Sequence, residues 1–243
     1  MSRNDPTWGC ARAKSGFKMS MLYTAAGSKA LELTKKQALM MFPTPLFTGV
    51  LSDLSVCDRV EKFVRGLQKA GKGKSAPERA SRIFMTEDNL HTLPEMKELV
   101  DVILLESGKV LDAYAVKRES HYITDMWANI THPNHFQPTH VHPNCLLSGL
   151  VYIRTPQHCG PTSFASPRRY TKNLEPRYLQ KNDLNSDFFV MPAEKGRMLI
   201  WPSHIPHSVE QGTADETEDR ITVPFNVMIR GVIDLYTANL ILK

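Results

Sequence analysis

Three histidines stand at a spacing that could hold one metal ion. His140 and His142 are two residues apart, and His207 lies much further along the chain. Side chains at positions i and i+2 of a strand point to the same face, so the first two imidazoles could reach one ion. The third would come from a distant strand. Imidazole binds iron, copper, nickel and zinc alike, so this spacing predicts a metal site without naming the metal.

Two close ligands and one distant ligand are also the plan of the facial triad of non-haem iron oxygenases. We therefore predict that His140, His142 and His207 are both the metal ligands and the catalytic centre. His204 is a poorer candidate because Pro206 separates it from His207, so the two should not share a strand face. His135 lies in a loop rich in proline and asparagine, where we expect a residue at the surface or at the rim of the site.

The elements that must position these residues fall into two parts. Apolar residues recur at helical spacing over 52–70 and 94–117, which predicts two helices, the first capped by Ser52 or Asp53. After Ser120 the chain changes to short apolar runs separated by turn residues, which predicts a β core over 121–237. The fold class is thus α+β but mainly β. We expect these strands at 121–130, 137–142, 146–154, 161–166, 186–191, 197–201, 206–210, 219–229 and 231–237.

Composition limits the class of protein. Hydrophobic residues make up 42% of the 243 residues, enough for a sizeable core. No run reaches the ~18 apolar residues of a membrane span, so no membrane partner is expected. The net charge is +5, but the basic residues are scattered among acidic ones, so nucleic acid is an unlikely partner. Four cysteines without a CxxC pair indicate reduced thiols and a cytoplasmic location.

The N-terminal segment 1–40 is basic and lacks a firm period, so we expect it to be poorly ordered. A single domain should follow over 41–243, with Pro43 and Pro45 leading into an edge strand. The sequence leaves the oligomeric state open, a homodimer being one possibility.

Short strings over most of the chain occur together in one order: FPTPL at 42–46, WAN at 127–129, HVHPN at 140–144, LSGLVY at 147–152, WPSHIPH at 201–207 and RITVPFN at 220–226. In these strings the chain resembles the 2-oxoglutarate/iron(II) oxygenases of bacteria and phages. The resemblance implies a double-stranded β-helix, a distorted jelly roll, flanked by the N-terminal helices. It also implies Fe(II), 2-oxoglutarate as co-substrate and O2, with hydroxylation of a C–H bond and release of succinate and CO2.

The chain departs from the wider superfamily at the second ligand. That ligand is usually a carboxylate, in an H-x-D or H-x-E motif, whereas here the position is His142. Three neutral imidazoles leave an iron(II) site near +2 rather than +1, which should ease binding of the 2-oxoglutarate dianion. An alternative is that His142 lies next to the ligands without binding the metal, and that water occupies the coordination position.

A 2-oxoglutarate enzyme needs a cation for the distal carboxylate, and arginine meets a carboxylate with two hydrogen bonds. We predict Arg220 for this role, because Arg220 and Thr222 resemble the Arg-x-Ser clamp of related oxygenases. An arginine paired with Asp219 or Glu218 is the alternative. Further residues are predicted to bind the co-substrate or the substrate: Tyr152, Asn129 and Ser148 the co-substrate, and Arg168 the substrate.

Two other functions fit the same histidines. A cupin-like metal oxygenase with three histidines would act without 2-oxoglutarate. A non-catalytic jelly-roll binding protein would show neither keto-acid turnover nor stoichiometric iron. The Arg220-x-Thr222 pair favours the 2-oxoglutarate enzyme, whose substrate the sequence does not identify.

Overall fold

The computed structural model describes residues 42–75, 83–132, 135–167, 174, 176–182, 184–213, 218–235 and 238–242. Contacts divide the chain into two units, Met1–Pro45 and Leu46–Lys243, and the fold below is that of the second. The segment 1–40 and Arg168 lie outside the described residues, so the predictions for them stay predictions.

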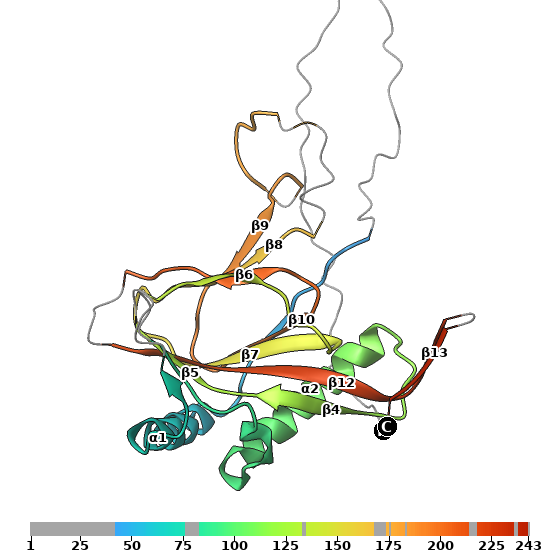
Figure 1. The fold of residues 1–243 in the computed structure, drawn as a ribbon. Coiled ribbons are helices and arrows are strands. Elements are labelled where there is room, and N and C mark those ends of the chain that lie inside the picture. The colour runs from blue at the N-terminus through green and yellow to red at the C-terminus, as the bar shows by residue number, and fades with distance from the viewer. Residues whose placement is uncertain are drawn as a thin grey trace, which may run out of the picture. The chain divides into compact units, whose positions relative to one another are not determined.

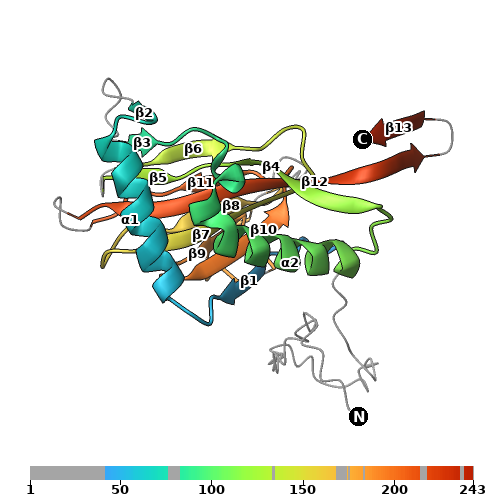
Figure 2. The ribbon, with the colours of Figure 1, turned by 90° about the horizontal axis from the view of Figure 1, so that it is seen from below.

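Two antiparallel sheets face each other, and two helices cover the outer side of the larger sheet (Figures 1 and 2). The larger sheet has the order β1 (Phe47–Val50), β10 (Arg197–Pro202), β7 (Leu147–Arg154), β12 (Arg220–Leu235), β5 (Asn129–Thr131), β3 (Ile83–Met85) and β2 (Lys74–Ser75). Strands β4 (Ser120–Met126) and β13 (Ala238–Leu242) also pair with β12. The smaller sheet has the order β6 (Gln137–His140), β11 (His207–Val209), β8 (Thr162–Ala165) and β9 (Phe188–Met191).

Helix α1 (Ser55–Lys69) lies against β7, and its buried stripe includes Val56, Val60 and Val64, as its periodicity predicts. The helix begins at Ser55 after Leu54, which makes no side-chain capping bond. Of the two predicted caps, Asp53 supplies one, because its carboxylate accepts a hydrogen bond from the backbone N–H of Ser55 at 2.9 Å. The carboxylate therefore still satisfies an amide at the start of the helix.

Helix α2 (Lys97–Ala113) follows two short 3-10 turns, η1 (Leu90–Thr92) and η2 (Pro94–Met96), and contacts β4. Turn η2 takes up the beginning of the predicted 94–117 helix, and α2 ends at Ala113, four residues before the predicted end. Neither described helix is long and apolar enough to cross a membrane.

The predicted mainly-β fold with flanking helices is confirmed, with two corrections to the order of the elements. Strands β2 and β3 lie between the two helices, so the helices do not simply precede an all-β half. These strands have two and three residues, too few to show an alternating pattern. The predicted runs 219–229 and 231–237 form one long strand, β12, which passes through Gly231 at a φ of +123°. Only glycine adopts that conformation readily, so Gly231 lets the strand continue.

Alternate residues of β7 serve two different cores. Val151 and Ile153 pack on the helix side of the larger sheet. Leu150 and Tyr152 point into the space between the sheets, where they join a separate cluster with Phe164, Leu199, Trp201 and Ile205. Because successive side chains of a strand point to opposite faces, polar residues of the larger sheet can also be directed into this inner space.

Gly149, in the middle of β7, is required for the packing of β12. A Cβ at this position would lie 2.2 Å from Phe225 Cζ and 2.7 Å from the carbonyl oxygen of Leu199. Gly149→Ala should therefore lower the free energy of unfolding by about 1–3 kcal/mol or more, the range for overpacked cores. Gly66→Ala in α1 is the matched control, because a Cβ there meets nothing within 4 Å. The control should stabilise the protein by up to about 1 kcal/mol through helix propensity. Urea unfolding of both variants measures the difference, and equal stability of Gly149→Ala and the wild type would contradict the packing.

Candidate metal centre

Two of the predicted ligands lie side by side on the smaller sheet. His140 on β6 pairs with His207 on β11, and the same row continues to Phe164 on β8 and Phe189 on β9. Side chains of residues paired in this way point to one face of a sheet. His207 is buried, His140 is half-buried, and Phe189 at the end of the row is 53% exposed. The row thus runs from the two histidines to an exposed phenylalanine on β9, the last strand of the smaller sheet.

His142 reaches the same place from a loop. Strand β6 ends at His140, and the following residues to Pro143 are outside any strand. The expectation that His140 and His142 share one strand face is therefore wrong. Pro143 has no N–H to donate to a sheet, and the backbone N–H of His142 bonds instead to the carbonyl oxygen of Ser203 at 3.2 Å.

The three histidines nevertheless converge. One ring nitrogen from each of His140, His142 and His207 lies within 4.8 Å of the others. The ring centroids of His140 and His207 are 4.3 Å apart. The ring centroid of His142 lies 5.2 Å from that of His140 and 5.1 Å from that of His207. His204 is exposed and lies outside this group. The residues that the sequence selects for a metal are thus the ones that the fold brings together.

The hydrogen bonds of the three rings leave the same nitrogen available on each. Nδ1 of His140 lies 2.9 Å from the carbonyl oxygen of Pro138, and Nδ1 of His207 lies 3.0 Å from the carbonyl oxygen of Ile205. Nδ1 of His142 lies 2.7 Å from Oδ1 of Asn226. These oxygens only accept hydrogen bonds, so each Nδ1 carries the proton in a neutral ring. The Nε2 lone pairs are then free to bind a metal. This pattern fits a metal ion, because metal-bound histidines usually donate their second N–H in this way.

Burial keeps two of these rings uncharged. It is the main cause that lowers the pKa of His207 to about 3, partly offset by the bond to Ile205 and reinforced by His140 and His142. Burial also lowers the pKa of His142, against the bond to Asn226. Neutral imidazole is the form that binds metals, so both side chains are ready for a cation at neutral pH.

The larger sheet presents an opposing row of side chains. Asp125 on β4 pairs with Asn226 on β12, Asn226 pairs with Ser148 on β7, and Ser148 pairs with Trp201 on β10. The Trp201 ring centroid is 4.8 Å from that of His207. The Ser148 hydroxyl donates to Asn226 Oδ1 at 2.8 Å. Ser148 was predicted to contact the co-substrate, and its observed partner is an asparagine that contacts a histidine of the centre.

Sequence reasoning singled out neither Asn226 nor Asp125. A signal for Asn226 was available, because it stands four residues after Thr222 and so faces the same side of one strand. Asp125 had no such signal, since its contact with Asn226 depends on the pairing of β4 with β12.

Arg220 is a buried cation that has no carboxylate partner among the residues that the structure describes. Arg220 is 4% exposed, and its Cζ atom lies 5.2 Å from the centre of the Tyr152 ring. Its Nε and Nη2 atoms are buried and have no hydrogen-bond partner among the described residues. An unpaired buried charge is costly. The guanidinium therefore fits an acidic ligand that binds between the sheets.

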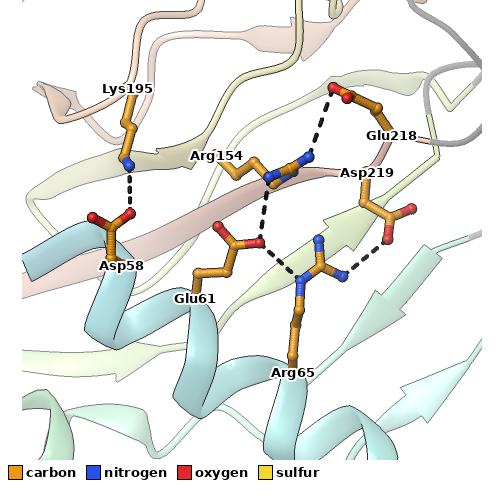
Figure 3. A network of polar contacts seen from close by, with 7 residues as sticks. All are labelled: Asp58, Glu61, Arg65, Arg154, Lys195, Glu218 and Asp219. Carbon is orange, nitrogen blue, oxygen red and sulfur yellow. Dashed lines mark hydrogen bonds and ion pairs between the residues drawn. The ribbon is translucent and has the colours of Figure 1, made fainter. Parts of the chain in front are cut away.

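The neighbouring acids pair with other arginines, as Figure 3 shows. Asp219 lies 3.1 Å from Arg65, and Glu218 lies 3.7 Å from Arg154. The alternative in which Arg220 pairs with Asp219 or Glu218 is therefore not seen. Glu61 on α1 joins both arginines to the same network (Figure 3).

The other predicted co-substrate residues form one row beside Arg220. Thr222 pairs with Tyr152 on one side and with Asn129 on the other. The Tyr152 hydroxyl lies 2.6 Å from Thr162 Oγ1 on the smaller sheet, and Asn129 Oδ1 is buried without a partner among the described residues. These groups surround the space next to Arg220, and their roles toward a ligand stay predictions.

Of the two positions expected for His135, the surface is wrong, and the rim of the site stays a prediction. The residue is 6% exposed, and its Nδ1 atom has no partner among the described residues. Burial, and then the charge of Arg220, lower its pKa to about 4. The histidine is thus a neutral group close to the unpaired arginine.

Comparison with known proteins agrees with this geometry. Residues 125–226 match the family model described as "Putative 2OG-Fe(II) oxygenase". No curated protein sequence matches the chain. Among solved structures, a prolyl-4-hydroxylase from Pseudomonas putida is similar at 10% identity and a TM-score of 0.55, covering 77% of this chain and 94% of that one.

Two further similar structures come from nogalamycin biosynthesis. The epimerase SnoN, in complex with Fe3+, alpha ketoglutarate and nogalamycin RO, has 10% identity and a TM-score of 0.59, with 82% of both chains covered. The carbocyclase SnoK has 16% identity and a TM-score of 0.56, with 77% of this chain and 81% of that one covered. At these identities the likeness concerns the fold, which is the double-stranded β-helix of the 2-oxoglutarate oxygenases.

Proposed function

We propose that this chain, whose residues 125–226 belong to the 2-oxoglutarate/iron(II) oxygenases, is a dioxygenase that hydroxylates a C–H bond of its substrate. The observation that carries the proposal is the joint presence of three converging histidines and a buried arginine that has no acidic partner among the described residues. A metal site alone would fit many proteins. An anion pocket beside it fits a keto diacid.

Each side chain has a role in this proposal. His140, His142 and His207 hold the iron through Nε2, and Arg220 binds the distal carboxylate of 2-oxoglutarate. The oxidant would be O2, bound and activated at the iron that these histidines would hold. One of its oxygen atoms would enter succinate as 2-oxoglutarate loses CO2, and the other would become the hydroxyl group of the product. Thr222 and Asn226 face the same side of β12, so Thr222 beside Arg220 and Asn226 beside His142 line the same side of the larger sheet.

The site also lowers the cost of bringing the dianion in from water. Three neutral ligands leave the iron(II) charge near +2, and Arg220 adds one positive charge at the other end. Tyr152, Thr222 and Asn129 offer hydroxyl and amide groups to the carboxylates. Trp201 and Phe164 form the apolar wall beside His207, at centroid distances of 4.8 Å and 6.2 Å. An apolar wall limits water around the reacting group.

Succinate release tests the proposal against its two alternatives. Purified protein supplied with Fe(II), O2, 2-oxoglutarate and candidate substrates should form succinate only when iron is present. A cupin-like oxygenase would consume O2 and substrate without the keto acid. A binding protein would do neither. The unpaired guanidinium favours the first result, because a keto-acid-independent enzyme has no need of a buried cation beside its metal.

The fold does not select the substrate. The similar proteins include a prolyl-4-hydroxylase, an epimerase and a carbocyclase. A cytoplasmic location and a homodimer stay predictions. The free thiols of Cys57, Cys145 and Cys159 agree with reducing surroundings, and light scattering would give the oligomeric state.

A further inference from the structure

An acidic side chain, Asp125, contacts the asparagine that hydrogen-bonds one of the three histidines. Asp125 and Asn226 are direct neighbours across β4 and β12, and the amide Nδ2 of Asn226 donates to Asp125 Oδ2. The other carboxylate oxygen, Oδ1, accepts from the hydroxyl of Thr124 at 3.0 Å. Asn226 is 6% exposed and Asp125 is half-buried. The carboxylate thus has two donors on its own sheet and lies outside the three-histidine group.

The contact with Asp125 decides which way the Asn226 amide points. A carboxylate can only accept hydrogen bonds, so it must face Nδ2. The amide oxygen Oδ1 is then left to face His142 Nδ1 at 2.7 Å. Ser148 also contacts Oδ1, but its hydroxyl can donate or accept and would serve either orientation. Among these neighbours, Asp125 is the group that selects the orientation.

The amide orientation in turn decides the tautomer of His142. With Oδ1 toward the ring, the proton of a neutral imidazole stays on Nδ1 and the Nε2 lone pair is free. With the amide reversed, Nδ2–H would meet Nδ1, the proton would move to Nε2, and His142 could not bind the metal through that atom. Because the groups are buried, a mismatched donor pair would be costly.

We propose that Asp125, acting through Asn226, is a positioning residue that holds His142 in its metal-binding tautomer. The proposal rests on the proposed function, since it takes His142 as a ligand.

The test exchanges the two side chains. In Asp125→Asn, two amides face each other and can hydrogen-bond in either direction, so the orientation of Asn226 is no longer fixed. In the exchanged variant Asp125→Asn/Asn226→Asp, a carboxylate at 226 accepts from His142, from Ser148 and from the amide at 125. The net charge and the number of hydrogen bonds then equal those of the wild type. Asp58→Asn is the charge-matched control, because Asp58 pairs with Lys195 on the far side of the sheet, at α1 (Figure 3).

Titration of the metal-free proteins with Co2+ should show a weaker affinity for Asp125→Asn, by the reciprocal of the fraction of His142 that keeps its proton on Nδ1, which is roughly twofold for one half and tenfold for one tenth. The exchanged variant should return to the wild-type affinity, and Asp58→Asn should be unchanged. Nitrogen-15 NMR of the metal-free proteins should place the His142 proton on Nδ1 in the wild type and the exchanged variant, and divide it between both nitrogens in Asp125→Asn.

Two results would overturn the inference. One is an Asp125→Asn variant with wild-type affinity and tautomer, and the other is an exchanged variant as weak as the single one. Thermal unfolding of the metal-free proteins separates these from a loss of fold. Absence of Co2+ and Fe(II) binding by the wild-type protein would instead remove the proposed function, and this inference with it.

Discussion

Replacing His207 by alanine should abolish stoichiometric iron binding while the protein stays folded. His207 is the most enclosed of the three histidines, and its ring lies within 4.3 Å and 5.1 Å of the other two ring centroids. Removal of a group behind a metal ligand costs about 10- to 100-fold in affinity, so loss of a ligand itself should exceed that range. Two imidazoles on a half-buried surface would then compete poorly with water. Metal analysis after anaerobic loading with Fe(II) gives the iron content.

The matched control is His204→Ala. His204 stands three residues earlier and is exposed, so its loss should leave the iron content unchanged. Circular dichroism of both variants checks the fold, which is needed because His207 also bonds the Ile205 carbonyl. Equal iron in His207→Ala and the wild type, with both folded, would show that the three rings do not form the metal centre.

Replacing Arg220 by alanine should weaken 2-oxoglutarate binding and leave iron binding almost intact. The guanidinium is buried and lacks a protein acceptor at Nε and Nη2 among the described residues, so a diacid would take its free donors. Loss of one partner of a buried, hydrogen-bonded charge pair costs about 2–5 kcal/mol. Since each 1.4 kcal/mol is tenfold, the dissociation constant should rise by roughly 30- to 3000-fold. Calorimetry of 2-oxoglutarate binding to the iron-loaded protein under nitrogen measures the change.

Two variants separate the geometry of Arg220 from its charge and from its surroundings. Arg220→Lys keeps the charge but loses the planar fork, so its affinity should fall between the wild type and Arg220→Ala. Arg154→Ala removes an arginine that is paired with Glu61 and Glu218, and it should leave 2-oxoglutarate affinity unchanged. An unaltered titration in Arg220→Ala, or a larger effect in Arg154→Ala, would exclude Arg220 as the carboxylate clamp.

The cluster of three histidines could be predicted from the sequence because its residue types are restrictive. Few side chains bind iron, and the spacing of His140, His142 and His207 left few other combinations. The turn-separated apolar runs after Ser120 likewise predicted most strands of both sheets, because a half-buried strand must alternate its side chains. The family-like strings then selected the double-stranded β-helix among β folds.

The remaining parts of the site depend on pairing between distant segments. His142 lies in a loop rather than on β6, and only the fold directs its ring toward His207. Whether Arg220 would pair with Asp219 was open in the sequence, because it depended on Arg65 of α1 taking that carboxylate. The role of Asp125 requires β4 and β12 to be neighbours in register, a relation between residues a hundred positions apart. Local patterns carry no information about such pairs.

Anaerobic titration of the iron-loaded protein with 2-oxoglutarate tests the account most directly, since it needs no substrate. Chelation of the ferrous ion by the keto acid should produce a weak charge-transfer band in the visible, saturating at one equivalent per protein. His207→Ala should give no band, and Arg220→Ala should give the same band only at much higher keto-acid concentration. Full iron occupancy without any band in the wild-type protein would contradict the account.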